Sequence, residues 1–301
     1  MRQIAIAEQA SLIGHGMALT FGLAGLLLVL PNPELILKLP VFGQQAFAWS
    51  MAGGGVVYIL LGAIAVSLYT VRNLGWKRWL SFMLPAVGLS LTSELLGTST
   101  GFPFGAYGYL NGLGYKIAGL VPFTIPLSWF YVGLCCYVLA RASLEQVKLP
   151  AILRRLTTIA LGALLLTAWD FVLDPAMSQT PYPFWQFQDV GEFFGMPYRN
   201  ITGWLGTGAI FMTVASYFWG DAALKLRRAQ LTTPLTIYLL NFVFGAVITL
   251  AQLDQRFWVM MGLSVCLGVV PAIVFYCSVP MTIATETNAA KSLPDLVQEP
   301  V

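Results

Sequence analysis

The chain has few charged residues. Asp, Glu, Lys and Arg make up only 10% of its 301 residues, against roughly 25% in an ordinary soluble domain, and the mean hydropathy is +0.75. This scarcity excludes a soluble enzyme, a disordered chain and a nucleic-acid binder, because each of these needs far more charge. The formal net charge of +3 is too small to indicate a partner by itself.

Histidine and cysteine are also scarce. The only histidine is His15, whereas histidine-box di-iron oxygenases and haem sites with paired histidines need several imidazoles. No Cys-x-x-Cys pair is present, and the four cysteines lie in apolar runs: Cys135, Cys136, Cys266 and Cys277. They are expected to be buried free thiols rather than zinc ligands or disulfides. We therefore expect no metal site, and a structural or interfacial role for His15.

Long apolar runs dominate the chain instead. A helix crosses a bilayer core with about 20 apolar residues, and eight stretches satisfy this: 11–30, 49–71, 79–96, 122–140, 156–173, 201–220, 233–252 and 257–279. The fold class is therefore all-α, a polytopic membrane bundle of about eight transmembrane helices. We expect residues 1–280 to form this membrane domain, and the polar segment 281–301 to be a disordered tail.

Basic residues are distributed unevenly over the predicted loops. The four loops of one side hold only Lys38, Lys116, Arg199 and Arg256. The three alternate loops hold ten: Arg72, Lys77, Arg78, Arg141, Lys148, Arg154, Arg155, Lys225, Arg227 and Arg228. By the positive-inside rule the richer set is cytoplasmic. Both termini are then cytoplasmic as well, in either the plasma membrane or the thylakoid membrane.

Two loops on the opposite, non-cytoplasmic side are rich in glycine, proline and aromatic residues. They comprise residues 97–121 and 174–200, and they carry little charge. Irregular backbone at membrane depth needs protein around it. We therefore expect both loops to re-enter the membrane face or to pack over the bundle.

Three carboxylates lie in the apolar runs, where charge is costly. Glu94 is near the end of one run, and Asp170 and Asp174 are near the end of another, all toward the aromatic loops. Asp170 and Asp174 share a face if the helix continues, and two such close carboxylates among apolar neighbours should not both be ionised. A neutral carboxyl group is what a general acid requires. The structural alternatives are a turn that starts at Asp174-Pro175 and a partly solvated Glu94.

The aromatic residues of this side have two interpretations. Some fit the interfacial belt of a membrane protein. Their concentration beside the acids also fits a pocket that stabilises a cation, because each aromatic face contributes about 0.5–2 kcal/mol. Acids in an aromatic, lipid-accessible pocket suit carbocation chemistry on an isoprenoid.

Other membrane classes fit the sequence less well. A retinal protein needs a lysine inside a span, and all lysines here lie in loops or in the tail. A membrane prenyltransferase binds a diphosphate through magnesium on two acidic motifs, and only Asp170-x-x-x-Asp174 is available. A transporter or lipid binder stays an alternative, although transporter sites usually lie near the midplane.

An ordered set of motifs resembles the CruF-type carotenoid 1,2-hydratase family. It comprises Glu94-x-x-Gly97, Thr100-Gly101-x-Pro103-Phe104-Gly105-x-Tyr107-x-Tyr109, Ile125-Pro126-x-x-Trp129, Asp170-x-x-x-Asp174-Pro175 and Gly195-x-Pro197-x-x-Asn200-x-x-Gly203-Trp204. The set runs from the third predicted span through the sixth, over a third of the chain. Ile201 departs from the aromatic residue expected after the asparagine.

The resemblance implies a hydro-lyase that needs no cofactor. Family members add water to the terminal C1=C2 double bond of an acyclic (psi) end of lycopene, gamma-carotene or bisanhydrobacterioruberin, which gives a tertiary 1-hydroxy carotenoid. An acid, Asp170 or Glu94, would protonate C2, and the partner acid or Asp174 would activate the water. The expected substrate-binding residues are Phe104, Tyr107, Tyr109, Trp129, Trp169, Trp185, Asn200 and Trp204.

The expected partners are a carotenoid taken from the lipid phase, membrane lipid and other enzymes of carotenoid biosynthesis. The closest alternative function is a membrane carotene cyclase, which starts with the same protonation but quenches the cation with an internal alkene. A polar rim of Ser99, Thr100, Asn200 and Thr202 favours an ordered water, and therefore hydration, over cyclisation.

Overall fold

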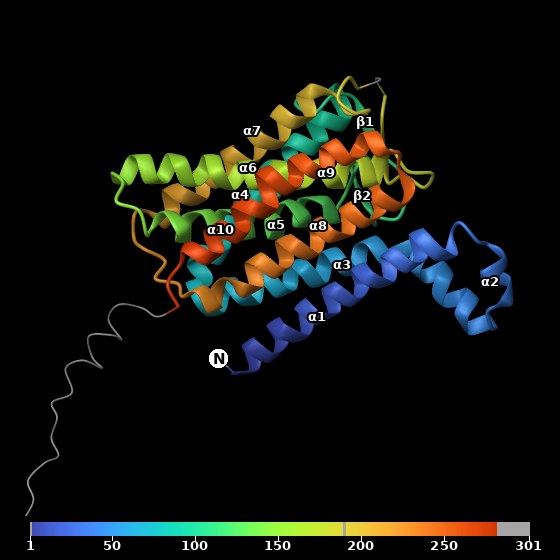
Figure 1. The fold of residues 1–301 in the computed structure, drawn as a ribbon, viewed down its shortest axis with the longest axis horizontal. Helices are drawn as coiled ribbons and strands as arrows, with labels where there is room; N and C mark the ends of the chain where they lie inside the picture. Colours follow the sequence, from blue (N-terminus) through green and yellow to red (C-terminus); the bar gives the residue numbers. More distant parts are fainter. Residues whose placement is uncertain (1, 189–190, 282–301) are drawn as a thin grey trace, which may run out of the picture.

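A computed structural model describes residues 2–188 and 191–281. Eight helical segments in it are long and apolar enough to cross a membrane. They are built from α1 (Arg2–Ala24) with its π-helical extension η1 (Gly25–Val29), α3 (Val41–Leu74), α4 (Trp76–Thr100), α5 (Thr124–Leu144), α6 (Ala151–Ser178), α7 (Tyr198–Trp219), α8 (Thr232–Gln252), and α9 (Trp258–Ser264) continued by η4 (Val265–Val269) and α10 (Val270–Ser278). The predicted all-α bundle is confirmed (Figure 1). The segment expected to be a tail lies almost wholly outside the described residues.

The helices are longer than the apolar runs that predict them. The first begins at Arg2 rather than near residue 11, and α3 begins at Val41 rather than near 49. A short helix, α2 (Glu34–Lys38), lies in the loop before α3. Between α3 and α4 the chain turns at Gly75, whose φ of +88° suits glycine. Hydropathy detects only the most apolar part of a helix, so less apolar ends are missed.

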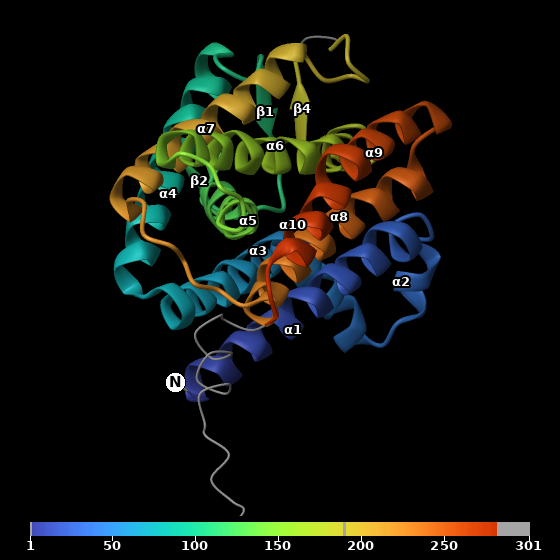
Figure 2. The ribbon, with the colours of Figure 1, turned by 60° about the vertical axis from the view of Figure 1, so that its left-hand side comes forward.

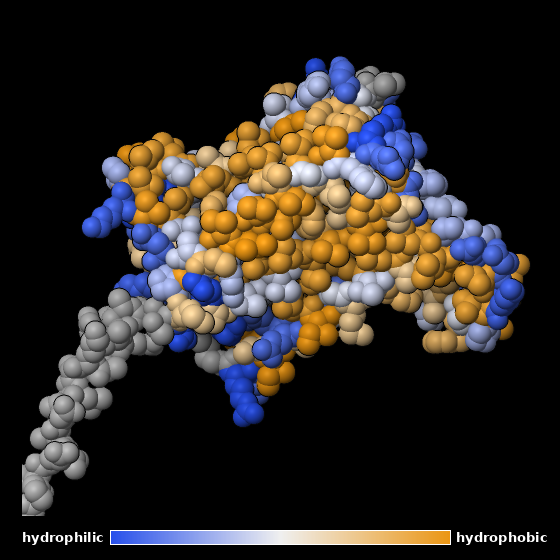
Figure 3. Space-filling model, in the orientation of Figure 1, coloured by the Kyte–Doolittle hydropathy of each residue, from blue (hydrophilic) through white to orange (hydrophobic). Residues whose placement is uncertain are grey.

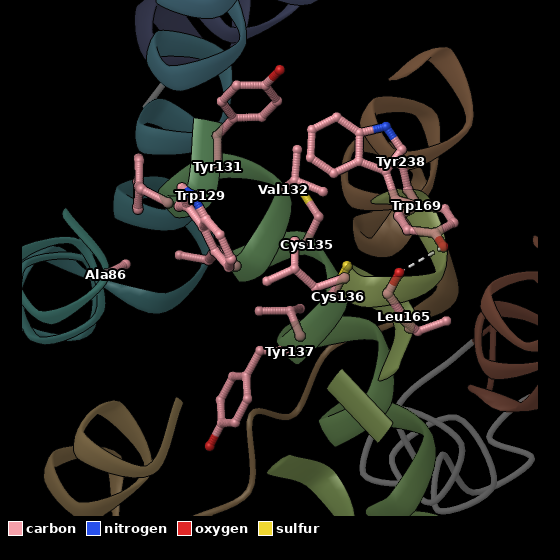
Figure 4. Packing of buried hydrophobic residues seen from close by; sticks show 14 of the residues in the cluster. Ala86, Trp129, Tyr131, Val132, Cys135, Cys136, Tyr137, Leu165, Trp169 and Tyr238 are labelled. Carbon is pink, nitrogen blue, oxygen red and sulfur yellow. Dashed lines mark hydrogen bonds between the residues drawn. The ribbon is translucent and has the colours of Figure 1, made fainter. Parts of the chain in front are cut away.

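Helix α5 is the centre of the bundle. Of its most apolar stretch, 94% is buried, against 11% for the first helical segment. Figure 2 shows α5 in the middle, with α3, α4, α6 and α10 around it. Figure 4 shows the packed side chains around α5, where the Tyr238 hydroxyl of α8 donates to the backbone oxygen of Leu165 at 2.9 Å. A helix that is buried on every side can present residues to a site from the core.

The outer helices turn apolar side chains away from the core. Ile13, Met17, Ile210 and Tyr217, for example, are each more than half exposed. Figure 3 shows hydrophobic residues over most of the middle of one face, with hydrophilic residues gathered mainly toward its ends. An apolar surface of this extent requires lipid around it. The protein is an integral membrane protein.

The loops predicted to be cytoplasmic gather at one end of the bundle. Arg141 donates to the backbone oxygens of Gly220 (2.8 Å) and Ala222 (2.9 Å), and Arg155 pairs with Asp221 at 2.8 Å. These contacts join the facing ends of α5 and α6, on either side of their loop, to the loop after α7. The alternation of loops that the prediction of orientation assumes is therefore present, while the side that faces the cytoplasm stays a prediction.

The two aromatic loops meet over the other end of the bundle. Strand β1 (Tyr107–Tyr109) pairs antiparallel with β4 (Trp185–Phe187), in the register Tyr107 with Phe187 and Tyr109 with Trp185. A second pair, β2 (Lys116–Ile117) with β3 (Val121–Pro122), closes a turn within the first loop. The expected packing of these loops over the bundle is confirmed. Strand pairing satisfies backbone groups that a loop at this depth could not leave open.

Candidate active site

Helix α6 brings Asp170 and Asp174 to one buried face. The helix continues through Pro175 to Ser178, so the interpretation of Asp174-Pro175 as the start of a turn is wrong. Both side chains are buried, with relative exposures of 1% and 2%. In a helix, residues four apart are neighbours at about 5–6 Å between Cβ atoms. The structure thus places the two carboxylates together under the aromatic loops.

Asp170 is held at one oxygen only. Its Oδ2 accepts a hydrogen bond from Asn200 Nδ2 of α7 at 2.9 Å. Its Oδ1 is buried and has no hydrogen-bond partner within the described residues. A buried polar atom of this kind is rare in folded proteins and indicates a place for a proton, a water or a ligand.

Asp174 also accepts one hydrogen bond, whereas Glu94 accepts three. Asp174 Oδ1 accepts from Trp185 Nε1 of β4 at 2.7 Å. Glu94, on α4, is 3% exposed. Its Oε1 accepts from Trp129 Nε1 at 2.9 Å, and its Oε2 accepts from the hydroxyls of Tyr109 at 2.8 Å and of Tyr107. The interpretation of Glu94 as a partly solvated interfacial residue is wrong.

The two tyrosines that bind Glu94 are fixed as hydrogen-bond donors. Burial, and next the negative charge of Glu94, raise the pKa of both the Tyr107 and the Tyr109 hydroxyl well above the usual value of 10. Both hydroxyls therefore keep their protons at neutral pH. They donate to the Glu94 carboxyl group and hold its orientation.

Three tryptophan rings, from α5, α6 and α7, pack against one another. Trp129 and Trp204 stack with ring centroids 4.0 Å apart, and Trp169 meets Trp204 edge-on at 5.9 Å. Phe104 lies 6.1 Å from Trp129. The indole nitrogen of Trp169 is buried and has no hydrogen-bond partner in the described part of the chain. The rings present several aromatic faces to one space.

One cavity joins these groups. All eleven residues predicted for catalysis and substrate binding line it, and among its described lining residues no lysine, arginine or histidine occurs. The cavity has a volume of about 50 Å³, counted as the space that the centre of a water molecule can occupy. That is room for a few waters, since one water needs about 10–15 Å³ by this measure. The cavity is acidic, aromatic and small.

The comparisons with known proteins agree with this geometry. Residues 54–271 match the profile of the family described as carotenoid biosynthesis protein. The chain belongs to that carotenoid biosynthesis family. It is also 29% identical over 257 residues to the bisanhydrobacterioruberin hydratase of Haloarcula japonica, a match that covers 84% of this chain and 80% of that protein. No solved structure matches the chain.

The range shared with the carotenoid biosynthesis family contains the whole candidate site, from α4 to α7. Helix α1 and His15 lie before it. His15 is fully buried, and its Nδ1 lies 2.8 Å from the backbone oxygen of Tyr58. Its Nε2 lies 3.1 Å from Asn241 Nδ2, and Asn241 Oδ1 accepts from the Tyr131 hydroxyl at 2.9 Å. The structural role predicted for His15 agrees with these contacts.

The polar rim predicted from sequence is wrong for three of its four members. Ser99 and Thr100 are exposed and donate to backbone oxygens of their own helix. Thr202 is also exposed and bonds to Arg199 O. Of the four, only Asn200 lines the cavity. Ser99 and Thr100 lie on the side of α4 away from Glu94, and Thr202 lies on the side of α7 away from Asn200. They therefore do not favour hydration over cyclisation.

Sequence reasoning also missed cavity residues in the apolar runs. Tyr58 of α3 and Tyr131 and Ser128 of α5 line the cavity. Polar atoms inside otherwise apolar spans are the signal that could have found them. Three aromatic residues of the loops, Phe102, Tyr182 and Tyr198, are instead 43–70% exposed, which fits the interfacial belt. The four cysteines are free, as predicted, although Cys266 and Cys277 are exposed rather than buried.

Proposed function

We propose that this chain is a carotenoid hydratase. It would add water to the terminal C1=C2 double bond of an acyclic psi end group, of gamma-carotene or lycopene, to give a tertiary 1-hydroxy carotenoid. The family and the hydratase relative support carotenoid hydration. The observation that carries the proposal is Asp170 Oδ1, a carboxyl oxygen without a partner among the described residues, in a cavity walled by tryptophan.

Asp170 is the proton donor in this proposal. Asn200 donates to Oδ2, which marks Oδ2 as the acceptor oxygen of a neutral carboxyl and leaves the proton on Oδ1. The π electrons of C1=C2 take this proton, which forms the C2–H bond and leaves a tertiary cation at C1. Glu94 is a weaker candidate for the acid, because protein donors already occupy both of its oxygens.

The aromatic walls stabilise the cation. Trp129, Trp169 and Trp204 offer ring faces within a space that holds no basic side chain in the described part of the chain. Each face contributes about 0.5–2 kcal/mol, more where water is excluded. The Glu94 carboxylate, held by Trp129 and two tyrosines, adds favourable electrostatics when it is ionised.

Water completes the reaction. Its oxygen forms a bond to C1, and its surplus proton passes to Asp174, the carboxylate nearest to the end of α6 that meets the outer loops. That proton returns to Asp170 before the next turnover, so the net addition is one H and one OH. The short separation of the two aspartates on one helix face allows this return.

Expression in bacteria that accumulate lycopene or gamma-carotene tests the proposal. We expect a more polar pigment, heavier by one water, whose new oxygen is labelled when the cells grow in ¹⁸O-water. An isomer of unchanged mass would identify a cyclase instead. Unchanged pigments, with the protein shown in the membrane fraction, would contradict hydration of these two carotenoids.

A further inference from the structure

The cavity at Asp170 is too small for a whole carotenoid. It has room for a few waters or for an isoprenoid end group, whereas an extended carotenoid is about as long as the ~30 Å bilayer core. A substrate whose end reaches Asp170 must therefore place the rest of its polyene chain in another space that adjoins this cavity.

A second cavity adjoins it at Tyr58. This space, here called the α1–α3 groove, lies between α1, η1, α3 and α8, and the outer loops cover one end of it. By the same measure as above it has about 440 Å³. Tyr58 lines both cavities. In both Figure 1 and Figure 2, α1, α3 and α8 lie side by side.

The lining of the α1–α3 groove suits a long, flat, apolar chain. Gly22, Gly25 and Gly54 take up little room, and Phe184 and Phe244 add aromatic faces. The rings of Tyr58 and Phe244 lie 5.7 Å apart. No charged side chain is among the described residues that line the groove. Such a surface binds a polyene through apolar and stacking contacts alone.

A rival groove exists but does not connect. It lies between α4 and α7 and is of similar size, about 480 Å³. It contains Arg199, and it shares no lining residue with the cavity at Asp170. The α1–α3 groove, which shares Tyr58 with the cavity at Asp170, is therefore the continuation of the candidate active site.

We propose that the α1–α3 groove binds the polyene arm of the substrate, with Tyr58 at the junction between the arm and the reacting end. The inference rests on the proposed function for the identity of the chain, an acyclic C40 polyene. In this proposal α1 closes the groove. Helix α1 lies outside the range of the family match.

Leucine substitutions at glycines test the groove. An added Cβ at Gly25 would meet nothing within 4 Å, and at Gly54 only Ser50 Oγ at 3.4 Å, so Gly54→Leu and Gly25→Leu fill the groove with little backbone disturbance. Gly53→Leu, next to Gly54 on α3, and Gly206→Leu, in the rival groove, are matched controls. Both have open space around the Cβ, and Gly53 does not line the α1–α3 groove.

The experiment measures the binding of lycopene to the purified, detergent-solubilised full chain. Binding is detected by the shift of the pigment's absorption spectrum and by its induced circular dichroism. We expect Gly54→Leu and Gly25→Leu to weaken binding at least about tenfold, and both controls to stay within about twofold of wild type. Thermal unfolding of each variant verifies that it is folded, and either groove variant alone suffices for the test.

Three results would overturn the proposal: wild-type binding by both groove variants, loss of binding in Gly206→Leu instead, or no polyene binding by the wild type. Failure of the proposed function is distinguishable. If the wild type binds lycopene through the groove but forms no hydrated product, the groove stands and hydration fails. If hydration and binding both persist in Gly54→Leu and Gly25→Leu, hydration stands and the groove fails.

Discussion

At the scale of single residues, the three buried acids differ in what holds them. Glu94 accepts three hydrogen bonds from protein donors, whereas Asp170 accepts one and has one oxygen without a partner among the described residues. A carboxyl that exchanges a proton with substrate needs an uncommitted oxygen. A fully bound carboxylate is better suited to fixing the rings around it. The contacts therefore assign different tasks to chemically similar side chains.

The first prediction concerns activity. Asp170→Asn removes the transferable proton and nearly preserves the shape of the side chain, so we expect hydration to fall about 10²- to 10⁴-fold. Asp221→Asn is the matched control, since Asp221 is exposed and pairs with Arg155 at the other end of the bundle. Pigment analysis at equal membrane levels of the two variants measures this. Turnover by Asp170→Asn within threefold of wild type would exclude Asp170 as the acid.

The second prediction concerns stability. Glu94→Ala leaves the Trp129 nitrogen and the Tyr107 and Tyr109 hydroxyls without their acceptor, which should lower the free energy of unfolding by about 1–3 kcal/mol. Asp170→Ala removes a hydrogen-bond acceptor from Asn200 alone, so it should lower the free energy of unfolding by less. The midpoints of thermal unfolding in detergent compare the two. An equal or larger loss in Asp170→Ala would contradict the different tasks given to these acids.

At the scale of elements, close packing sets the position of the first aromatic loop. Phe104 lies between Gly97 of α4 and Gly203 of α7, where an added Cβ would come within 2.8 Å and 2.5 Å of its ring. Glycine at both positions lets the ring sit against the two helices. Phe104 in turn lies beside Trp129 in the cavity wall. The helix pair thus positions a loop residue at the site.

The third prediction follows from this packing. Gly203→Ala forces Phe104 from its place and should destabilise the protein by about 1–3 kcal/mol, with a several-fold loss of hydration. Gly206→Ala, one turn further along α7, meets nothing within 4 Å and should be neutral or slightly stabilising. Unfolding midpoints and pigment yields of the pair measure the difference. Identical behaviour of the two variants would mean that Phe104 moves without cost.

At the scale of the whole molecule, a polar network fastens α1 to the bundle. His15 of α1 contacts the backbone of Tyr58 in α3 and the side chain of Asn241 in α8, which also binds Tyr131 in α5. Few other residues of α1 are buried. Because Tyr58 and Tyr131 line the candidate active site, the network links the outermost helix to the cavity.

The fourth prediction tests this attachment. Asn241→Leu leaves the Nε2 atom of His15 and the hydroxyl of Tyr131 without a partner, and should destabilise the protein by about 1–2 kcal/mol. Asn32→Leu is the control, because the exposed Asn32 amide bonds only to Leu28 O of the same segment. Limited proteolysis and thermal unfolding in detergent report on α1 and on the bundle. Equal stability of both variants would show that the other contacts of α1, such as the 2.7 Å pair of Glu8 with Arg72 of α3, hold it without this network.

The amino-acid sequence alone predicts the membrane bundle, the eight spans and the loops that cover one end. These follow from the local density of apolar and turn-forming residues, because a bilayer favours an apolar helix whatever segments pack beside it. It also named eleven residues that line one cavity, since buried acids and clustered aromatics stand out against an apolar chain. The orientation and the roles of these residues stay predictions.

Only the tertiary structure decided how these residues meet. The pairing of β1 with β4, the central place of α5 and the outward position of Ser99 and Thr100 depend on helix rotations that hydropathy does not fix. The different hydrogen bonding of Asp170 and Glu94 depends on donors from distant segments, such as Asn200 and Trp129. The physical reason is that side-chain partners and cavities arise where helices pack, and packing joins residues far apart in the chain.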